Sequence, residues 1–229
     1  MKPSYLAFFL VLFSGSACLC AQDLTAAANY QRFAKTNSGI APRVVFIGNS
    51  ITEGWADVRP NFFTNNGFVG RGISGQTSPQ LLLRFRQDVI NLHPQAVVIN
   101  IGTNDIAQNT GEYSLQYTLD CITSMAELAY ANGIKVILSS VTPAKEYPWR
   151  KKVKNVPATI DALNANIKQL ADAKGYWYLD YNVLMRDANG GMIKEYTTDE
   201  VHVTKAGYAV MEKAALAIIE KVLPPMNNE

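Results

Sequence analysis

The sequence is poor in the residue types on which disulfides and many metal sites depend. Its 229 residues include only two histidines and three cysteines. Two of the cysteines, Cys18 and Cys20, lie in or next to an N-terminal leader, which leaves Cys121 alone in the body of the chain. An internal disulfide and a cysteine-based metal site are therefore excluded there. Chemistry based on histidine has two candidates, His93 and His202.

Charged residues are also scarce. They make up 17% of the chain and leave a formal net charge of +2 at neutral pH. Such a balance creates no strong electric field that would attract nucleic acid, so we expect no nucleic-acid partner. A local basic cluster at residues 150–154 is short, and it is typical of a solvated loop.

The apolar run near the N-terminus is short. Residues 5–13 are apolar, follow the positive charge of Lys2 and precede the small residues Ser14–Ala17. This order is typical of a secretory signal peptide, and the run is too short to span a bilayer. We expect residues 1–21 to be a leader. The mature protein is then exported, to the periplasm or outside the cell, without stable insertion in a membrane.

The cleavage point stays open, because Ala17 and Ala21 both suit the signal. Cys18 loosely resembles a bacterial lipoprotein acceptor, but the aliphatic residue that usually stands three positions before it is absent. We therefore favour an exported protein without a lipid anchor at Cys18.

In the rest of the chain, residues 22–229, short apolar segments alternate with helical stretches. The pattern predicts strands at 44–47, 68–73, 96–101, 135–138 and 176–179. It predicts helices at 80–92, 114–132, 157–174 and 204–222. Continuous Val- and Ile-rich runs are typical of parallel strands buried on both faces. No linker divides the segments, so we expect one α/β domain, a three-layer α/β/α sandwich with a mostly parallel sheet.

Polar, glycine-bearing segments follow three of the predicted strands. They occupy residues 48–53, 74–77 and 102–105. In open α/β sheets, ligands bind beyond the carboxyl ends of the strands. We therefore expect these segments to meet at one rim of the sheet, together with the segment 199–202. His93 directly precedes a strand, which places it at the opposite edge.

A serine, a histidine and an aspartate are candidates for a nucleophilic site at this rim. Ser50 follows the first strand, and Asp199 stands three residues before His202. In a turn or short helix, that spacing lets the carboxylate meet one ring nitrogen while the other nitrogen accepts the serine proton. The alternative for Ser50 is a plain helix cap. The alternative for the other pair is that Asp199 caps a turn and His202 is packed.

Acyl transfer also needs donors aimed at the developing oxyanion. Gly75 offers a backbone N–H in a turn that admits close approach, and Asn104 offers a side-chain amide. Taken singly, both are also common turn residues.

In chain order, four blocks resemble those of the SGNH (GDSL-type) serine hydrolases. They are Gly48-Asn49-Ser50, Gly75, Gly102-Thr103-Asn104-Asp105 and Asp199-x-x-His202, within residues 44–207. The resemblance implies a flavodoxin-like five-stranded α/β/α fold, ester hydrolysis, and neither metal nor cofactor. It implies Ser50 as nucleophile, His202 as base and Asp199 as the residue that orients it. The oxyanion hole would combine the N–H groups of Ser50 and Gly75 with the Asn104 amide.

The chain departs from the family pattern at one position. Asn49 stands where the first block usually has aspartate, which changes the charge beneath the nucleophile but not the triad. Asp105 and Glu200 lie inside matching blocks without a role in the chemistry, and we interpret them as structural.

Aromatic residues near the predicted rim indicate a substrate class. Trp55, Tyr147 and Trp149 would offer faces for a sugar ring, although buried anchors of a loop are an equal alternative. We expect a small-molecule or carbohydrate ester as substrate, and removal of short acyl groups, acetyl first. The alternatives are a lysophospholipase or thioesterase, a catalytically silent carbohydrate-binding relative, and a flavodoxin-like phosphate or flavin binder.

Overall fold

The computed structural model describes residues 23–224. The expected leader, residues 1–21, and Cys18 lie outside this part of the chain. Five parallel strands form one sheet in the order β2-β1-β3-β4-β5. They are β1 (Val44–Gly48), β2 (Phe68–Gly72), β3 (Ala96–Asn100), β4 (Lys135–Ser139) and β5 (Trp177–Leu179). The predicted strands are confirmed, and the sheet is parallel throughout.

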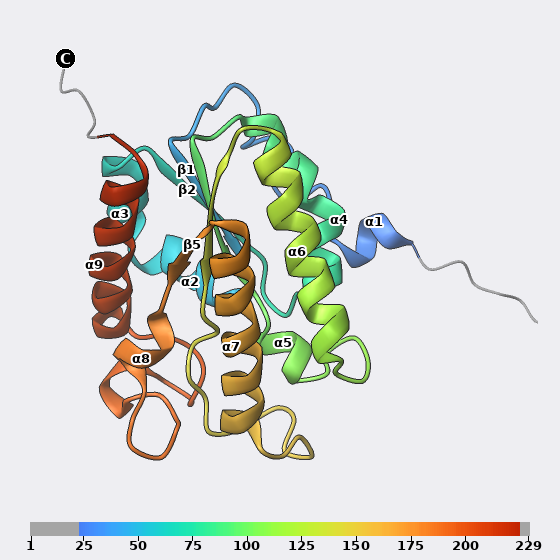
Figure 1. Ribbon diagram of the computed structural model, residues 1–229, viewed down its shortest axis with the longest axis vertical. Helices are drawn as coiled ribbons and strands as arrows, with labels where there is room; N and C mark the ends of the chain where they lie inside the picture. Colours follow the sequence, from blue (N-terminus) through green and yellow to red (C-terminus); the bar gives the residue numbers. More distant parts are fainter. Residues whose placement is uncertain (1–22, 225–229) are drawn as a thin grey trace, which may run out of the picture.

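Helices cover both faces of the sheet (Figure 1). One face carries α4 (Ser78–Asp88), α6 (Leu115–Ala131) and α7 (Val156–Lys174). The other carries α2 (Ser50–Val58), α3 (Pro60–Asn65), α8 (Tyr181–Met185) and α9 (Lys205–Val222). Shorter turns are α1 (Leu24–Ala27), α5 (Thr103–Ile106) and 3₁₀ segments at Ile90–Leu92 and Lys194–Tyr196. The three-layer α/β/α architecture is confirmed, with the flavodoxin-like strand order.

The central strands explain the two cores. Every residue of β1 and β3 is buried. Because side chains alternate along a strand, Val45 and Ile47 join the cluster beneath α4, α6 and α7, whereas Val44 and Phe46 join the cluster beneath α2 and α9. A continuous apolar run is therefore required in these strands, which is why their sequences show no polar alternation.

Two helical features differ from the prediction. The helix expected at 80–92 begins earlier, at Ser78, and its cap is Thr77, whose N–H donates to the Gln80 side chain at 3.0 Å. The short helices α3, α5 and α8 were not predicted, and neither was α2, in which Gly54 obscures the apolar period. This helix begins directly at Ser50.

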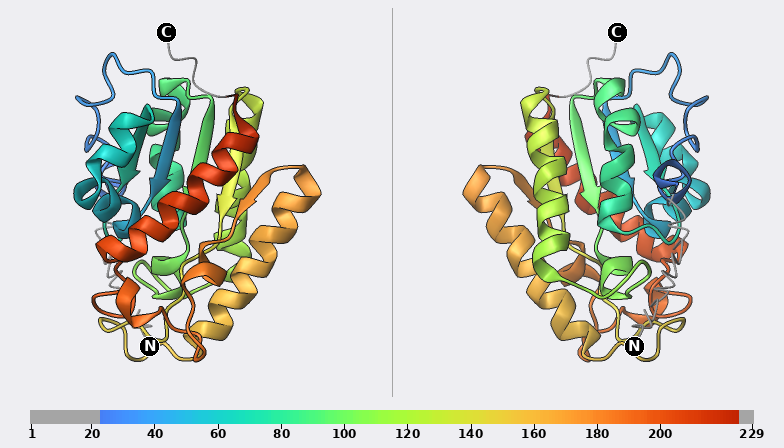
Figure 2. Two further views of the ribbon diagram at one scale, coloured as in Figure 1. Left: turned by 90° about the vertical axis from the view of Figure 1, so that its left-hand side faces the viewer. Right: turned by 90° about the vertical axis from the view of Figure 1, so that its right-hand side faces the viewer.

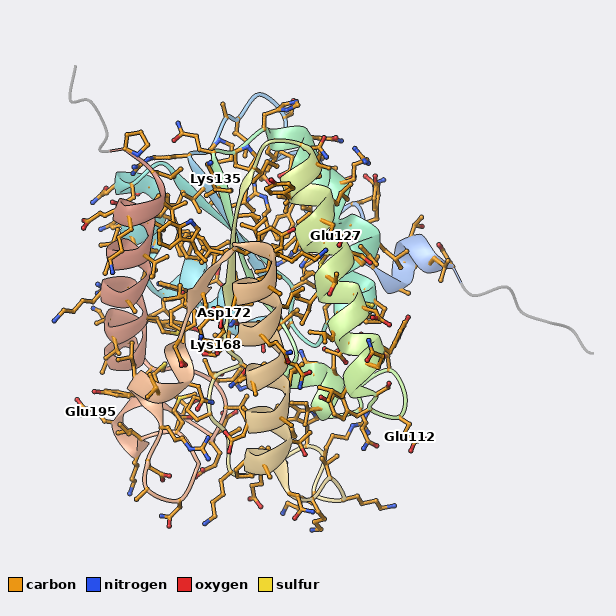
Figure 3. The ribbon with its side chains drawn as sticks, in the orientation of Figure 1. Glu112, Glu127, Lys135, Lys168, Asp172 and Glu195 are labelled. Carbon is orange, nitrogen blue, oxygen red and sulfur yellow. The ribbon has the colours of Figure 1, made fainter. Side chains whose placement is uncertain are left out.

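The carboxyl ends of the strands point to one end of the molecule (Figure 2). Lys135, at the start of β4, and Glu112, which follows α5, lie at opposite ends of the molecule in Figure 3. The chain leaves β1 toward β2 on one side and returns to β3 on the other side, so β1 ends at the topological switch point. Within residues 23–224, no helix has both the length and the apolar character needed to cross a membrane.

Gly72 lies at the end of β2 against the first turn of α2, and replacement by alanine tests this packing. A Cβ there would lie 2.1 Å from the Glu53 nitrogen and 2.6 Å from the Asn49 carbonyl oxygen. Backbone cannot yield as a flexible side chain can, so we expect Gly72→Ala to lower the free energy of unfolding by about 3 kcal/mol or more. Urea unfolding measures it.

The control is Gly191→Ala, whose added Cβ would meet only side-chain atoms, the nearest from Lys145 at 3.1 Å. That overlap is only a few tenths of an ångström and a small local shift relieves it, so we expect a loss below about 1 kcal/mol. Equal losses in the two variants would contradict the close approach of β2 to α2.

Candidate functional site

Ser50 is the first residue of helix α2, directly beyond the buried strand β1. The side chain of Asn49 caps this helix, and its Oδ1 accepts from the Ile51 N–H at 3.1 Å. Because the first N–H groups of a helix have no intrahelical partner, the Ser50 N–H is available to an oxyanion. The Ser50 hydroxyl is half-buried at the rim of the sheet. Strand and cap together hold it in place.

A hydrogen-bond chain joins the three residues of the predicted triad. The Ser50 Oγ lies 3.1 Å from His202 Nε2, and His202 Nδ1 lies 2.7 Å from Asp199 Oδ2. A carboxylate only accepts, so Nδ1 carries the proton and Nε2 presents its lone pair to the hydroxyl. The structure thus brings together residues 152 positions apart in the arrangement that activates a serine.

The turn carrying Asp199 and His202 is closed by its own backbone. Thr197 and Val203 form an antiparallel bridge across it. Asp199 Oδ1 accepts from the N–H groups of Val201, at 3.1 Å, and of His202, at 2.7 Å. Partial burial acts to raise the pKa of Asp199, but hydrogen bonds from the His202 ring and backbone outweigh it and hold that pKa below its usual value. The carboxylate therefore stays ionised into mild acid.

Gly75 and Asn104 lie at adjoining loops of the same rim. Gly75 adopts φ of +78°, a left-handed conformation that favours glycine. The Asn104 side chain is buried and donates from Nδ2 to the Gln76 carbonyl at 3.0 Å. Ser74, just before Gly75, donates its N–H at 2.8 Å to Glu53 of α2. The two predicted oxyanion donors are thus tied to each other and to the helix that begins at Ser50.

A buried arginine that sequence reasoning missed holds this arrangement from below. Arg84 is fully buried. It donates from Nε to Gln76 Oε1 at 2.6 Å, from Nη1 to Asp88 Oδ2 at 2.9 Å, and from Nη2 to the Gly48 carbonyl at 3.0 Å. Burial lowers the pKa of Arg84, and the Asp88 carboxylate opposes that shift. The end of β1 and the loop after Gly75 are therefore joined to one buried charge.

Two of the three predicted substrate contacts are wrong. Trp55 is 2% exposed. Its ring stacks against Phe62, at 5.0 Å, and Tyr208, at 5.8 Å, in the core beneath α9. Tyr147 is 0% exposed and belongs to the opposite core cluster. Both are the buried anchors that the alternative described, because a large apolar ring gains more from burial than from exposure at a polar rim.

Trp149 does lie at the site. Its side chain is 41% exposed. Its ring centroid is 6.0 Å from that of His202, at an interplanar angle of 32°. The indole Nε1 donates to Asn109 Oδ1 at 3.1 Å. No sequence pattern marked Asn109, which lies in an irregular loop five residues after Asn104.

Asp105 contacts the start of α4, and His93 lies before β3. The buried Asp105 carboxylate accepts from the Ser78 N–H at 2.9 Å and from its hydroxyl at 2.6 Å, which joins α5 to the start of α4. Burial raises the pKa of Asp105, and the bonds from Ser78 oppose the shift. His93 ends the turn before β3, at the predicted opposite edge. Among residues 23–224, no three His, Cys, Asp or Glu side chains cluster closely enough to hold a metal ion.

Comparison with known proteins gives consistent matches. The model of the GDSL-like lipase/acylhydrolase family matches residues 46–210, more than half of the chain. The solved structure of a GDSL-like lipase from Bacteroides thetaiotaomicron is 53% identical, with a TM-score of 0.83, and the match covers 86% of this chain and 99% of that one.

Two more distant proteins are also similar. Esterase TesA of Pseudomonas aeruginosa is 29% identical over 136 residues, 58% of this chain and 65% of that relative, so the match spans just under two thirds of its length. A catalytic mutant of the acetylxylan esterase Axe2 from Geobacillus stearothermophilus is 20% identical, with a TM-score of 0.60, over 80% of this chain and 96% of that one. At that identity, the likeness concerns the fold alone.

Replacing Arg84 tests the buried charge beneath the site. Arg84→Met leaves the Asp88 carboxylate buried without its ion-pair partner, so we expect the free energy of unfolding to fall by roughly 3–5 kcal/mol. Chemical denaturation measures the loss.

Lys168→Met is the matched control. Lys168 and Asp172 lie together on α7 (Figure 3), also four residues apart, at 2.8 Å, but their side chains are 56% and 64% exposed. Solvent screens such a pair, so we expect a change within about 0.5 kcal/mol. Similar losses in both variants would contradict a larger contribution of the buried pair to the free energy of unfolding.

Proposed function

Because the chain belongs to the GDSL-like lipase/acylhydrolase family, we propose that it is a serine esterase that removes short acyl groups, acetyl above all, from carbohydrate esters. The observation that carries this proposal is the continuous chain from Asp199 through His202 to the Ser50 hydroxyl. A plain helix cap or a packed histidine does not require that alignment. The leader expected at residues 1–21 supports an exported enzyme.

The first half of the reaction forms an acyl-enzyme. Ser50 Oγ attacks the ester carbonyl carbon while His202 Nε2 takes the hydroxyl proton, and Asp199 stabilises the resulting imidazolium. The carbonyl oxygen becomes an oxyanion, which the N–H groups of Ser50 and Gly75 and the Asn104 amide stabilise. As the tetrahedral intermediate collapses, the bond to the alcohol breaks and His202 returns the proton to the leaving oxygen.

The second half releases the acid. Water gives a proton to His202 Nε2 as its oxygen attacks the acyl carbon, and a second tetrahedral intermediate forms. The bond to Ser50 Oγ then breaks, and the proton on His202 returns to that oxygen. The same donors stabilise both intermediates, so one oxyanion hole serves both steps.

Two observations support a short acyl group on a sugar. The exposed indole face of Trp149 beside His202 suits the apolar face of a sugar ring. An apolar cavity of about 440 Å³ lies between α1, α4 and α6, and neither Ser50 nor His202 lines it. This cavity therefore offers no room for an acyl chain bound to Ser50.

Replacing Ser50 tests the nucleophile. We expect Ser50→Ala to lower kcat on p-nitrophenyl acetate by roughly 10³-fold or more, because the acyl-enzyme can no longer form. The burst of nitrophenol in stopped-flow traces disappears with it. Ser124→Ala, which removes an exposed hydroxyl on α6, keeps the wild-type rate. Near-normal hydrolysis by Ser50→Ala would refute the proposed function.

Replacing Trp149 tests the substrate class. We expect Trp149→Ala to raise KM for acetylated oligosaccharides roughly 3- to 10-fold, because aromatic stacking contributes about 0.5–1.5 kcal/mol. KM for p-nitrophenyl acetate changes less. Trp177→Ala is the control, since Trp177 is 39% exposed on the edge strand β5.

A panel of nitrophenyl esters of rising chain length tests the acyl group. The proposal expects rates to fall beyond acetate. A preference for long chains would instead favour the lysophospholipase or thioesterase alternative.

A further inference from the structure

Asn109 makes contacts with three parts of the site at once. Its Nδ2 donates to Asn104 Oδ1 at 3.0 Å and to the Gly75 carbonyl at 3.2 Å. Its Oδ1 accepts from Trp149 Nε1 at 3.1 Å. Its backbone N–H donates to the Asn104 carbonyl at 3.0 Å, which fixes the loop between the two asparagines. One side chain thus links both predicted oxyanion donors to the aromatic residue beside His202.

These contacts determine which way the Asn104 amide points. Its Oδ1 accepts from Asn109, and one hydrogen of its Nδ2 goes to the Gln76 carbonyl. An amide has two such hydrogens, so the second remains free for the oxyanion. If the amide turned over, its oxygen would face the Gln76 carbonyl and its NH₂ would face the Asn109 NH₂. Both contacts would then repel, so Asn109 and Gln76 together hold the donating orientation.

We propose that Asn109 is a positioning residue of the esterase reaction. It holds the Asn104 amide so that an N–H, and not the oxygen, meets the developing oxyanion, and it couples this orientation to Trp149. The inference rests on the proposed esterase function. Asn109 acts through Asn104, and its side chain donates or accepts only at Asn104, Gly75 and Trp149 among the described residues. A donor of this kind acts only when its orientation is set before the reaction.

Asn109→Asp is the sharpest test, because it keeps the shape and replaces a donor by an acceptor. The introduced carboxylate would repel Asn104 Oδ1 and favour the turned amide. Loss of one oxyanion donor typically lowers turnover by roughly 10²–10³-fold, so we expect a decrease in kcat of about 10- to 100-fold, with KM for p-nitrophenyl acetate little changed. Thermal unfolding is measured alongside.

Gln108→Glu is the matched control. It adds the same charge one residue away, on an exposed side chain. We expect its kcat to stay within about twofold of the wild type, because exposed charges are strongly screened. If Asn109→Asp also stays within about twofold while the wild type is active, the inference is overturned and the proposed function stands. If the wild type is no more active than Ser50→Ala, the proposed function itself fails.

A double-mutant cycle separates positioning from a merely structural role, and it also decides the matter if Asn109→Asp does not fold. Asn109→Ala removes the contact to Asn104, and Asn104→Ala removes the donor. If Asn109 acts through Asn104, the double variant is no slower than Asn104→Ala alone, because residues that act as a unit are not additive. Losses of kcat that multiply would overturn the inference.

Discussion

The buried Arg84 guanidinium constrains the geometry around Ser50. The Arg84 guanidinium is out of contact with solvent, so each of its donors must be matched by an acceptor within the protein. Those acceptors are the Gly48 carbonyl at the end of β1, the Gln76 side chain in the loop after Gly75, and the Asp88 carboxylate on α4. Displacing any of them would leave a polar group buried without a partner. The strand that presents Ser50 and the loop that presents Gly75 therefore cannot shift independently.

Residues 28–37 extend this network of buried polar contacts. Asn37 donates to Asp88 at 2.8 Å and accepts from Arg71 at 2.8 Å, and the Phe33 ring lies 4.9 Å from the Arg71 guanidinium. Gln76, which accepts from Arg84, also donates to the Ala28 carbonyl at 2.6 Å. A network with every member paired is rigid, because each bond strengthens in the low dielectric of the interior. These residues thus help to hold Gln76, whose carbonyl accepts from Asn104, a proposed oxyanion donor.

The part of the site that could be predicted consists of residues marked by a local sequence pattern. Buried parallel strands need apolar runs, and catalytic turns directly follow them, so the rim segments could be located before any contact was known. The four blocks carried a family resemblance that the family model confirms. Trp55 and Tyr147 show the limit of this reasoning. An aromatic residue that the sequence places near the rim can face solvent or the core, because the rotation of its helix or the path of its loop determines where the ring points.

The sequence by itself determined the alternating α/β order, the parallel sheet and the positions of Ser50, Asp199 and His202, since hydrophobic periodicity and short polar blocks act locally. Only the tertiary structure decided what supports those residues. Arg84 and Asn109 gain their importance from partners in other loops, at separations that no local pattern encodes. Their contacts form only once the strands have packed, because folding brings the carbonyl oxygens of Gly48 and Gly75 within reach of these side chains.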